Sequence, residues 1–319
     1  MKKGDISPTF QYIFVAIAGA LILFFFFQFG TGQVRLSRSL DAFTILNTVD
    51  DALTALGVSQ DASTNFPEQK WPEAVTLHIG KGVNCGRLAV DNSNFVSANK
   101  IIFGADNIKG TQFNVWSVNW KYPFGIDNFY YLSSISNRYY IIGNSELTDL
   151  DSSEHIPARF NAGAIAEDEI QEKLNANFDF IKIVSFSRET GQPDSTYIEA
   201  IDCGEEKEDS MCRGMVHFKD KTLPFYGKAM MYGAIFADDA DSYECAYNNA
   251  MQRLKAVAIV YQQKARMLQL KKLGCIGYTG IIELLGMIID NSHDLGNVRQ
   301  RLIQQNDIIA GTKECATVF

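Results

Sequence analysis

The sequence has 319 residues, is 46% hydrophobic and 12% aromatic, and carries a formal net charge of −8. This acidic balance argues against nucleic acid as a partner, because nucleic-acid-binding proteins present basic stripes to the phosphates. The residues behind a short N-terminal segment are enough for one large domain or two ordinary ones, each with a hydrophobic core.

An uninterrupted apolar segment, Tyr12–Phe27, lies close to the N-terminus. With Phe10 and Phe29 at its edges it is about 20 residues long, which at roughly 1.5 Å per residue matches a hydrocarbon core of about 30 Å. The segment is not followed by a small-x-small cleavage site, which argues against a cleaved signal peptide. We therefore expect a retained, single-pass transmembrane helix.

The charges that flank this segment are nearly balanced. Lys2 and Lys3 precede it and Arg35 and Arg38 follow it, so the positive-inside rule decides little. Residues 1–32 are slightly basic, so the acidic excess and all the cysteines lie behind the apolar segment. We expect the large domain to be extracytoplasmic at the cell membrane, with membrane lipid as one partner.

Behind the apolar segment, apolar residues recur at spacings of three and four. This pattern predicts an amphipathic helix of about six turns, ended by Gly57. The segment Ser59–Pro67 is rich in residues that stop helices and predicts a linker. The apolar stripe consists of Leu36, Leu40, Phe43, Leu46, Val49, Leu53 and Leu56.

The middle of the chain is dominated by short segments typical of strands. One helix, Ala164–Leu174, is expected among them. Strand-rich segments with one inserted helix favour a mixed or antiparallel sheet over regular βαβ alternation. Single strands are expected at Val75–Ile79, Lys100–Phe103, Gln112–Trp120, Met215–Phe218 and Met230–Phe236. Hairpins are expected for Phe129–Leu132 with Tyr139–Ile142, and for Phe178–Phe186 with Thr196–Ile201.

The last part of the chain is typical of helices. An apolar stripe from Tyr243 to Leu268 predicts one helix of about seven turns. Ile281–Ile289 and Leu295–Ile309 predict two shorter helices, and the first of these is too short to span a membrane. The fold class expected is α+β, divided into a membrane anchor (1–32), an amphipathic stem helix and linker (33–66), a β-rich ectodomain (67–240) and a C-terminal helical region packed on it (241–319).

Six cysteines outside a membrane allow up to three disulfides, with fifteen possible pairings. Cys203 and Cys212 enclose the polar loop GEEKEDSM, which predicts a locally closed hairpin. Buried free thiols are the alternative, and they would be expected if the domain faced the cytoplasm. The six candidates are Cys85, Cys203, Cys212, Cys245, Cys275 and Cys315.

The histidines form no H-E-x-x-H or H-x-H motif, so we expect no metal site and no cofactor. The catalytic candidates are His217 and the carboxylates of Asp238, Asp239 and Asp241, which would serve a hydrolase if they converge in one cleft. The simpler interpretation is a hydrogen-bonded strand histidine and an acidic first turn of a helix.

Aromatic side chains on the expected strands are the candidate binding surface, because aromatic faces recur at recognition sites. Cross-strand packing in the core is the alternative. The binding candidates are Trp116, Trp120, Tyr122, Tyr130 and Tyr139.

The N-terminus resembles the leader of type IV prepilin-like proteins, in particular the archaeal class III pattern. Lys3, Gly4 and Ser7 match that pattern. Asp5 stands where glutamine is usual in the family, and Thr9 stands where glutamate is usual. The resemblance covers the leader and the stem helix, and it implies cleavage between Gly4 and Asp5 and self-assembly through the N-terminal helix.

Together these patterns favour a single-pass, membrane-anchored cell-surface protein with a structural or interaction role and a pilin-like stem. Protein partners, or self-assembly, are expected beside membrane lipid. Two alternatives stay open: a membrane-tethered extracytoplasmic enzyme of the hydrolase kind, and an accessory subunit of an export or pilus machine. Of these interpretations, an enzyme is favoured less than a non-enzymatic protein.

Overall fold

We describe the fold from a computed structural model of the chain. By its internal contacts the chain divides into two units, Met1–Thr48 and Val49–Phe319. The structure describes residues 17, 19–20, 23–24, 42–58, 63–66, 71, 73–91, 93–94, 96–144, 146–148, 156–175, 177–187, 195–203, 211–271, 275, 277–290, 294–312 and 315–319.

The first unit is described at a few helical positions between 17 and 24 and at residues 42–48. Among the described residues no helix combines the length and the apolar character that crossing a membrane requires, which contradicts the transmembrane helix of the expected fold class. The rest of Tyr12–Phe27 lies outside the described residues, as do Gly4 and Asp5 at the expected cleavage point.

Residues 42–58 are helical, as the three- and four-residue spacing predicts. Within the second unit, Leu53 of this helix is completely buried. The helix ends against β8, where the side-chain amide of Asn128 donates to the Gly57 carbonyl at 2.6 Å. The expected linker behind it instead contains a strand, β1 (Ser63–Phe66).

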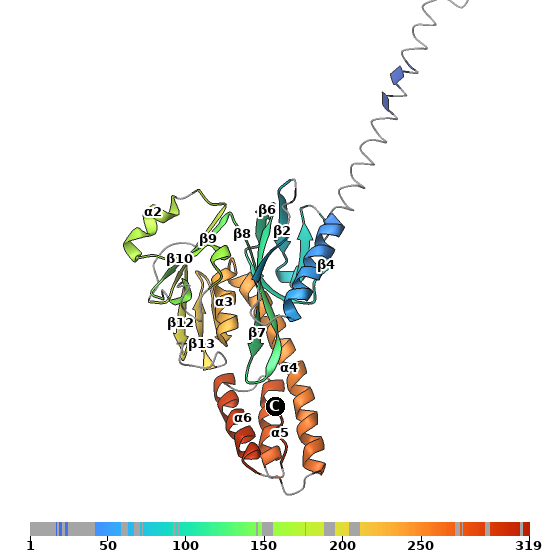
Figure 1. The fold of residues 1–319 in the computed structure, drawn as a ribbon, viewed down its shortest axis with the longest axis vertical. Coiled ribbons are helices and arrows are strands. Elements are labelled where there is room, and N and C mark those ends of the chain that lie inside the picture. Colours follow the sequence, from blue (N-terminus) through green and yellow to red (C-terminus); the bar gives the residue numbers. More distant parts are fainter. Residues whose placement is uncertain are drawn as a thin grey trace, which may run out of the picture. The chain divides into compact units, whose positions relative to one another are not determined.

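Within the described part of the second unit the strands form three sheets, shown in Figure 1. The first sheet has the order β1-β7-β8-β5 and is antiparallel except for the parallel pair β5 and β8. Its other strands are β7 (Phe113–Lys121), β8 (Gly125–Ser134) and β5 (Ile101–Gly104). The second sheet is antiparallel and has the order β4 (Val96–Ser97), β3 (Arg87–Val90), β2 (Val75–Ile79) and β6 (Asn107–Gly110).

The third sheet is mixed. The pairs β10–β9, β9–β11 and β11–β12 are parallel, and the pairs β12–β13 and β13–β14 are antiparallel. The order is β10 (Ala162–Ala164), β9 (Asn137–Ile142), β11 (Phe180–Ser185), β12 (Ser195–Ile201), β13 (Arg213–His217) and β14 (Thr222–Tyr226). The protein is therefore α+β with mixed sheets.

Both expected hairpins are wrong. The first pair of segments became β8 and β9, which lie in different sheets. A strand has two edges, and β8 already lies between β7 and β5 while β9 lies between β10 and β11. The second pair became β11 and β12, which are neighbours but parallel. The sequence could not show this, because a connection as short as residues 186–194 usually reverses the chain.

The segment Met230–Phe236 was expected as a strand but is part of a helix, α3 (Lys228–Phe236), and all nine residues of α3 are buried. The helix contacts β5, β7 and β8 of the first sheet and β12, β13 and β14 of the third, so it lies between them. A helix buried on every side has no polar face, and periodicity cannot distinguish it from a buried strand. A Cβ at Gly233 would meet the Phe103 ring at 2.5 Å, so glycine permits this close approach.

A buried lysine caps the C-terminal end of α3. Lys182 of β11 is 2% exposed, and its Nζ donates to the carbonyl oxygens of Ala234, at 3.0 Å, and Ala237. The last carbonyls of a helix have no partner within the helix. Burial lowers the pKa of Lys182 to about 7, although Asp238 and Asp239 act in the opposite direction. A neutral amine has two hydrogens to donate, which matches the two carbonyls.

All six cysteines are paired, which confirms the expected disulfides and excludes the free-thiol alternative. The loop between β12 and β13 is closed by its own two cysteines, as predicted. Loop-closure entropy predicts that the pair separated by 160 residues contributes most, roughly 5 kcal/mol against roughly 3 kcal/mol for the pair separated by 9. The pairs are Cys85–Cys245, Cys203–Cys212 and Cys275–Cys315.

The helix α4 (Ala240–Lys271) has 32 residues, and its two halves have different neighbours. The first half packs on the sheets, where Arg253 forms an ion pair with Asp127 at 3.2 Å. The second half packs against α5 (Gly277–Ile289), which in turn packs against α6 (Leu295–Ala310), so both expected C-terminal helices are present. We call residues 259–271 together with α5 and α6 the helical arm; it extends away from the sheets in Figure 1.

The lysine cap predicts a pH dependence of stability. Because the pKa of Lys182 is about 7 in the folded protein and about 10.5 in the unfolded chain, the unfolded chain binds one more proton between these values. Wild-type stability relative to Lys182→Met should therefore rise from pH 7 to pH 10, by up to about 1.4 kcal/mol per pH unit, and level off below pH 7. Urea unfolding at each pH measures the difference.

Lys219 is exposed, and Lys219→Met is the matched control, which should not reproduce this slope. A flat difference between wild type and Lys182→Met across the same pH range would contradict the assignment of the cap.

Candidate functional site

The five aromatic binding candidates are buried rather than exposed. Trp116 packs against Tyr232 of α3 with ring centroids 4.9 Å apart, and the Trp120 indole donates to a backbone carbonyl of β14 at 2.7 Å. Burial raises the pKa of Tyr139 to about 12. The five residues therefore pack in the core, which is the alternative that the sequence left open, because these strands are covered by α3 and neighbouring elements. The relative exposures are 5% for Trp116, 0% for Trp120, 1% for Tyr122, 6% for Tyr130 and 0% for Tyr139.

The histidine candidate is held within its own sheet. His217 ends β13, with its Nε2 3.6 Å from a Glu199 carboxylate oxygen and its Nδ1 3.1 Å from the Thr222 hydroxyl. Its ring stacks on Tyr197 at 5.1 Å. These partners lie on β12 and β14, and none of them belongs to the acidic cluster 238–241.

Within the acidic cluster, Asp239 caps α4. Its carboxylate accepts from the Ser242 backbone N–H at 2.9 Å, and its own N–H donates to the Ser242 hydroxyl at 3.1 Å. The other carboxylate oxygen accepts from Lys81 at 2.7 Å, and Lys81 also pairs with Asp106. Asp238 and Asp241 flank this cap at the same helix start. The cluster is thus a joint between the loop after β2 and the start of α4.

The pKa values of this joint follow from burial and pairing. Burial alone would lower the pKa of Lys81, but its hydrogen bonds to Asp106 and Asp239 outweigh burial and raise it. Burial would raise the pKa of Asp239, but hydrogen bonds from Lys81 and Ser242 lower it. Burial raises the pKa of Asp106, against the effect of Lys81. The lysine stays charged, which suits a structural ion pair better than a proton-transfer group.

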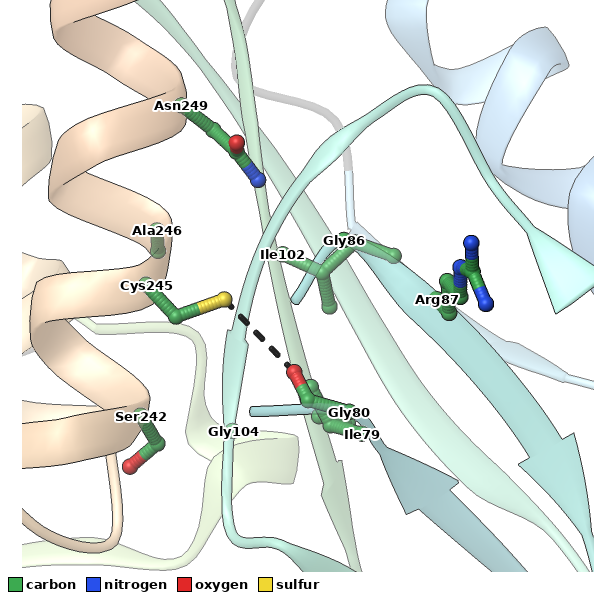
Figure 2. Close-up of a pocket in the computed structure, with 10 residues that line it drawn as sticks. All are labelled: Ile79, Gly80, Gly86, Arg87, Ile102, Gly104, Ser242, Cys245, Ala246 and Asn249. Atoms are coloured by element: carbon green, nitrogen blue, oxygen red, sulfur yellow. Dashed lines mark hydrogen bonds between the residues drawn. The ribbon is translucent and has the colours of Figure 1, made fainter. Parts of the chain in front are cut away.

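Beside this joint lies a hollow between α4 and the strands, drawn in Figure 2. Its volume of about 10 Å³ has room for about one water molecule, not for a substrate. The Cys245 Sγ lies 3.6 Å from the Gly80 carbonyl oxygen; as a disulfide sulfur it carries no proton, so this is a packing contact. The lining residues are Ile79, Gly80, Gly86, Arg87, Ile102, Gly104, Ser242, Cys245, Ala246 and Asn249.

The second half of α4 presents a mainly apolar exposed surface, with the exposed Gln263 in its middle, which we call the α4 stripe. At about 100° per residue its members fall within roughly one third of the helix circumference. They lie opposite the buried residues Leu254, Ala258 and Ala265, which face the core. The α4 stripe consists of Ile259, Val260, Met267 and Leu270, which are 42%, 64%, 59% and 77% exposed.

Basic side chains border the α4 stripe on both edges. By the same helical spacing, Lys255 and Arg266 fall along one edge, and Lys264 and Lys271 along the other. Lys264 donates to the Val318 carbonyl at 2.7 Å, which leaves its charge beside the stripe. An apolar stripe with cationic borders suits an acidic, partly apolar binding partner.

The sequence contained a signal for this surface. Between Cys245 and Ile282 there are six basic residues and no Asp or Glu, in a chain of net charge −8. The apolar residues from Tyr243 to Leu268 predicted only the side of this helix that faces the core. The exposed side combines two patterns, local basic charge and apolar residues at helical spacing. Neither pattern alone indicates a binding surface, but the two together do.

Comparison with protein families, with curated proteins and with solved structures gave no match. Function must therefore be argued from the site itself. Within the part of the chain that the structure describes, no group of three or more His, Cys, Asp or Glu side chains is placed to hold a metal ion. The α4 stripe is the candidate functional site.

The exposure of the α4 stripe predicts that it contributes little to the stability of the single chain. Met267→Ser with Leu270→Ser should change the free energy of unfolding by less than about 0.5 kcal/mol per site. The matched control is Leu254→Ala on the buried side of the same helix, which should lower it by about 2–5 kcal/mol. Urea unfolding with intact disulfides measures both. A loss in the stripe variant as large as in the control would mean that the stripe packs within the chain.

Proposed function

We propose that this chain is a disulfide-stabilised interaction protein of the cell surface, and that it meets its partner through the α4 stripe. The observation that carries the proposal is an exposed apolar stripe with basic borders on a helix that the sheets and α5 hold in place. Exposed apolar side chains that serve no packing within a chain mark interaction surfaces when they are contiguous.

The extracytoplasmic location is supported by the cysteines. All six are paired, and one pair closes a separation of 160 residues. Structural disulfides persist in oxidising compartments and are rare in the cytoplasm, where thiols are kept reduced. A protein whose cysteines are all paired in this way fits the outside of the cell.

The size of the α4 stripe sets the strength of the interaction. Fully burying an aliphatic side chain contributes about 1.5–3 kcal/mol, so covering the exposed fractions of these four contributes roughly 4–7 kcal/mol. Association costs about 4–15 kcal/mol in lost freedom of motion. The apolar contacts alone therefore give weak binding, and the basic borders are needed for partner choice and for a fast encounter.

The location is tested on unbroken cells that make the protein. A membrane-impermeant amine reagent should modify the protein, and a maleimide should add no mass until a reductant is supplied. Intact mass spectrometry of the isolated chain gives both results. Protection from the amine reagent, or maleimide labelling without reduction, would contradict an extracytoplasmic protein.

A further inference from the structure

We infer that the partner of the α4 stripe is a second copy of this chain, which presents an acidic surface around α2 (Ile170–Leu174). The inference rests on the proposed function, because it names the partner of the same stripe. It is carried by the complementarity of two exposed surfaces of one chain, one basic and apolar, the other acidic and apolar.

The acidic surface, which we call the α2 patch, lies at α2 and the segment after it. Between Ala164 and Phe180 the sequence holds five acidic residues and one lysine. Among them Asp168, Glu172 and Asp179 are exposed. Two large apolar side chains are exposed beside them, Leu174 at 39% and Phe178 at 37%.

The two surfaces match in chemistry. Carboxylates of the α2 patch would meet the cationic borders of the α4 stripe, chiefly Arg266 and Lys271, which are exposed. The aliphatic side chains of the stripe would cover Leu174 and Phe178. Opposite charge around an apolar centre is the arrangement of a specific, weak to moderate protein interface.

One chain cannot make this contact with itself. Figure 1 shows α2 and the free end of the helical arm at opposite ends of the unit Val49–Phe319. The contact therefore joins different surfaces of two copies. Such a head-to-tail contact forms a ring if the rotation closes and an open chain if it does not.

A lipid surface suits the α4 stripe less well. Basic helices that lie on membranes combine Lys and Arg with Trp, Phe or Leu on the apolar face. Of these three apolar residue types the α4 stripe contains only leucine, at Leu270, and its other members are Ile259, Val260 and Met267. Its chemistry is that of a protein-facing helix, and the chain carries a matching surface.

The test is charge reversal with complementation, using the full chain and sedimentation velocity at low and high salt. The arm variant carries Arg266→Glu and Lys271→Glu; the patch variant carries Asp168→Lys and Glu172→Lys. Wild type should associate with rising concentration at low salt and dissociate at high salt. Each variant alone should associate at least tenfold more weakly. An equimolar mixture of the two should recover association, because each reversed surface then meets its opposite.

The recovery in the mixture also shows that both variants fold. A monomeric wild type, or a mixture that stays dissociated, overturns the inference. An effect of the arm variant without one of the patch variant overturns it too, and leaves the α4 stripe with another acceptor. Binding of wild type to phosphatidylglycerol vesicles that the arm variant loses, without association between copies, assigns the stripe to lipid. If wild type associates or binds vesicles and Met267→Ser with Leu270→Ser leaves that binding unchanged, the α4 stripe is not the contact surface and the proposed function itself fails.

Discussion

A helix buried on every side constrains the rest of this protein. The helix α3 lies between the first and third sheets, and none of its nine residues has access to a solvent-facing side. Its terminal carbonyls must therefore find donors inside the protein, since an unpaired buried polar group is costly. The Lys182 amine, on β11, is the donor to the carbonyl oxygens of Ala234 and Ala237. The lysine that satisfies the helix also ties it to the third sheet.

The helix α4 connects this centre to the candidate surface. After α3 the chain runs through the acidic cluster into α4. Three interactions hold the start of α4: the Asp239 cap, the ion pair of Asp239 with Lys81, and the Cys85–Cys245 disulfide. Further along, the Gln262 side chain donates to an α5 carbonyl at 3.0 Å. The α4 stripe is thus presented on a helix that is held at its start and along its second half, which lowers the conformational entropy that binding must oppose.

The sequence predicted the parts of the fold that are buried on one face. The helices α5 and α6 matched their expected positions because their buried residues recur on one face, and the strand Val75–Ile79, in which Leu77 is buried, matched its expected bounds as well. Among segments buried on both faces, β5 and β7 were predicted as strands, but the fully buried helix α3 was mistaken for one, because period carries no information once every position is apolar. The segment Met230–Phe236 was therefore predicted as a strand although it is helical. Trp116 and Trp120 were candidates for a binding face although they are buried.

Pairing over long distances was also beyond the sequence. The disulfide closed within one loop was predicted from its spacing, whereas the one across 160 residues requires the packed fold. The pairing and direction of the strands could not be predicted for the same reason. Which strand lies beside another in a sheet depends on the positions of all the other strands. The sequence contains one sign of the candidate site, the basic stretch without acidic residues after Cys245. Which of its side chains are exposed follows only from the packing of the helical arm.

The central claim, that α3 is the element on which the first and third sheets depend, is tested most directly by native-state hydrogen exchange. Peptides from α3 should exchange only through global unfolding, with the same free energy and denaturant dependence as the whole unit. They should belong to the most protected set in the protein. Exchange of α3 through a local opening, at a free energy well below that of global unfolding while the two sheets stay protected, would contradict the account.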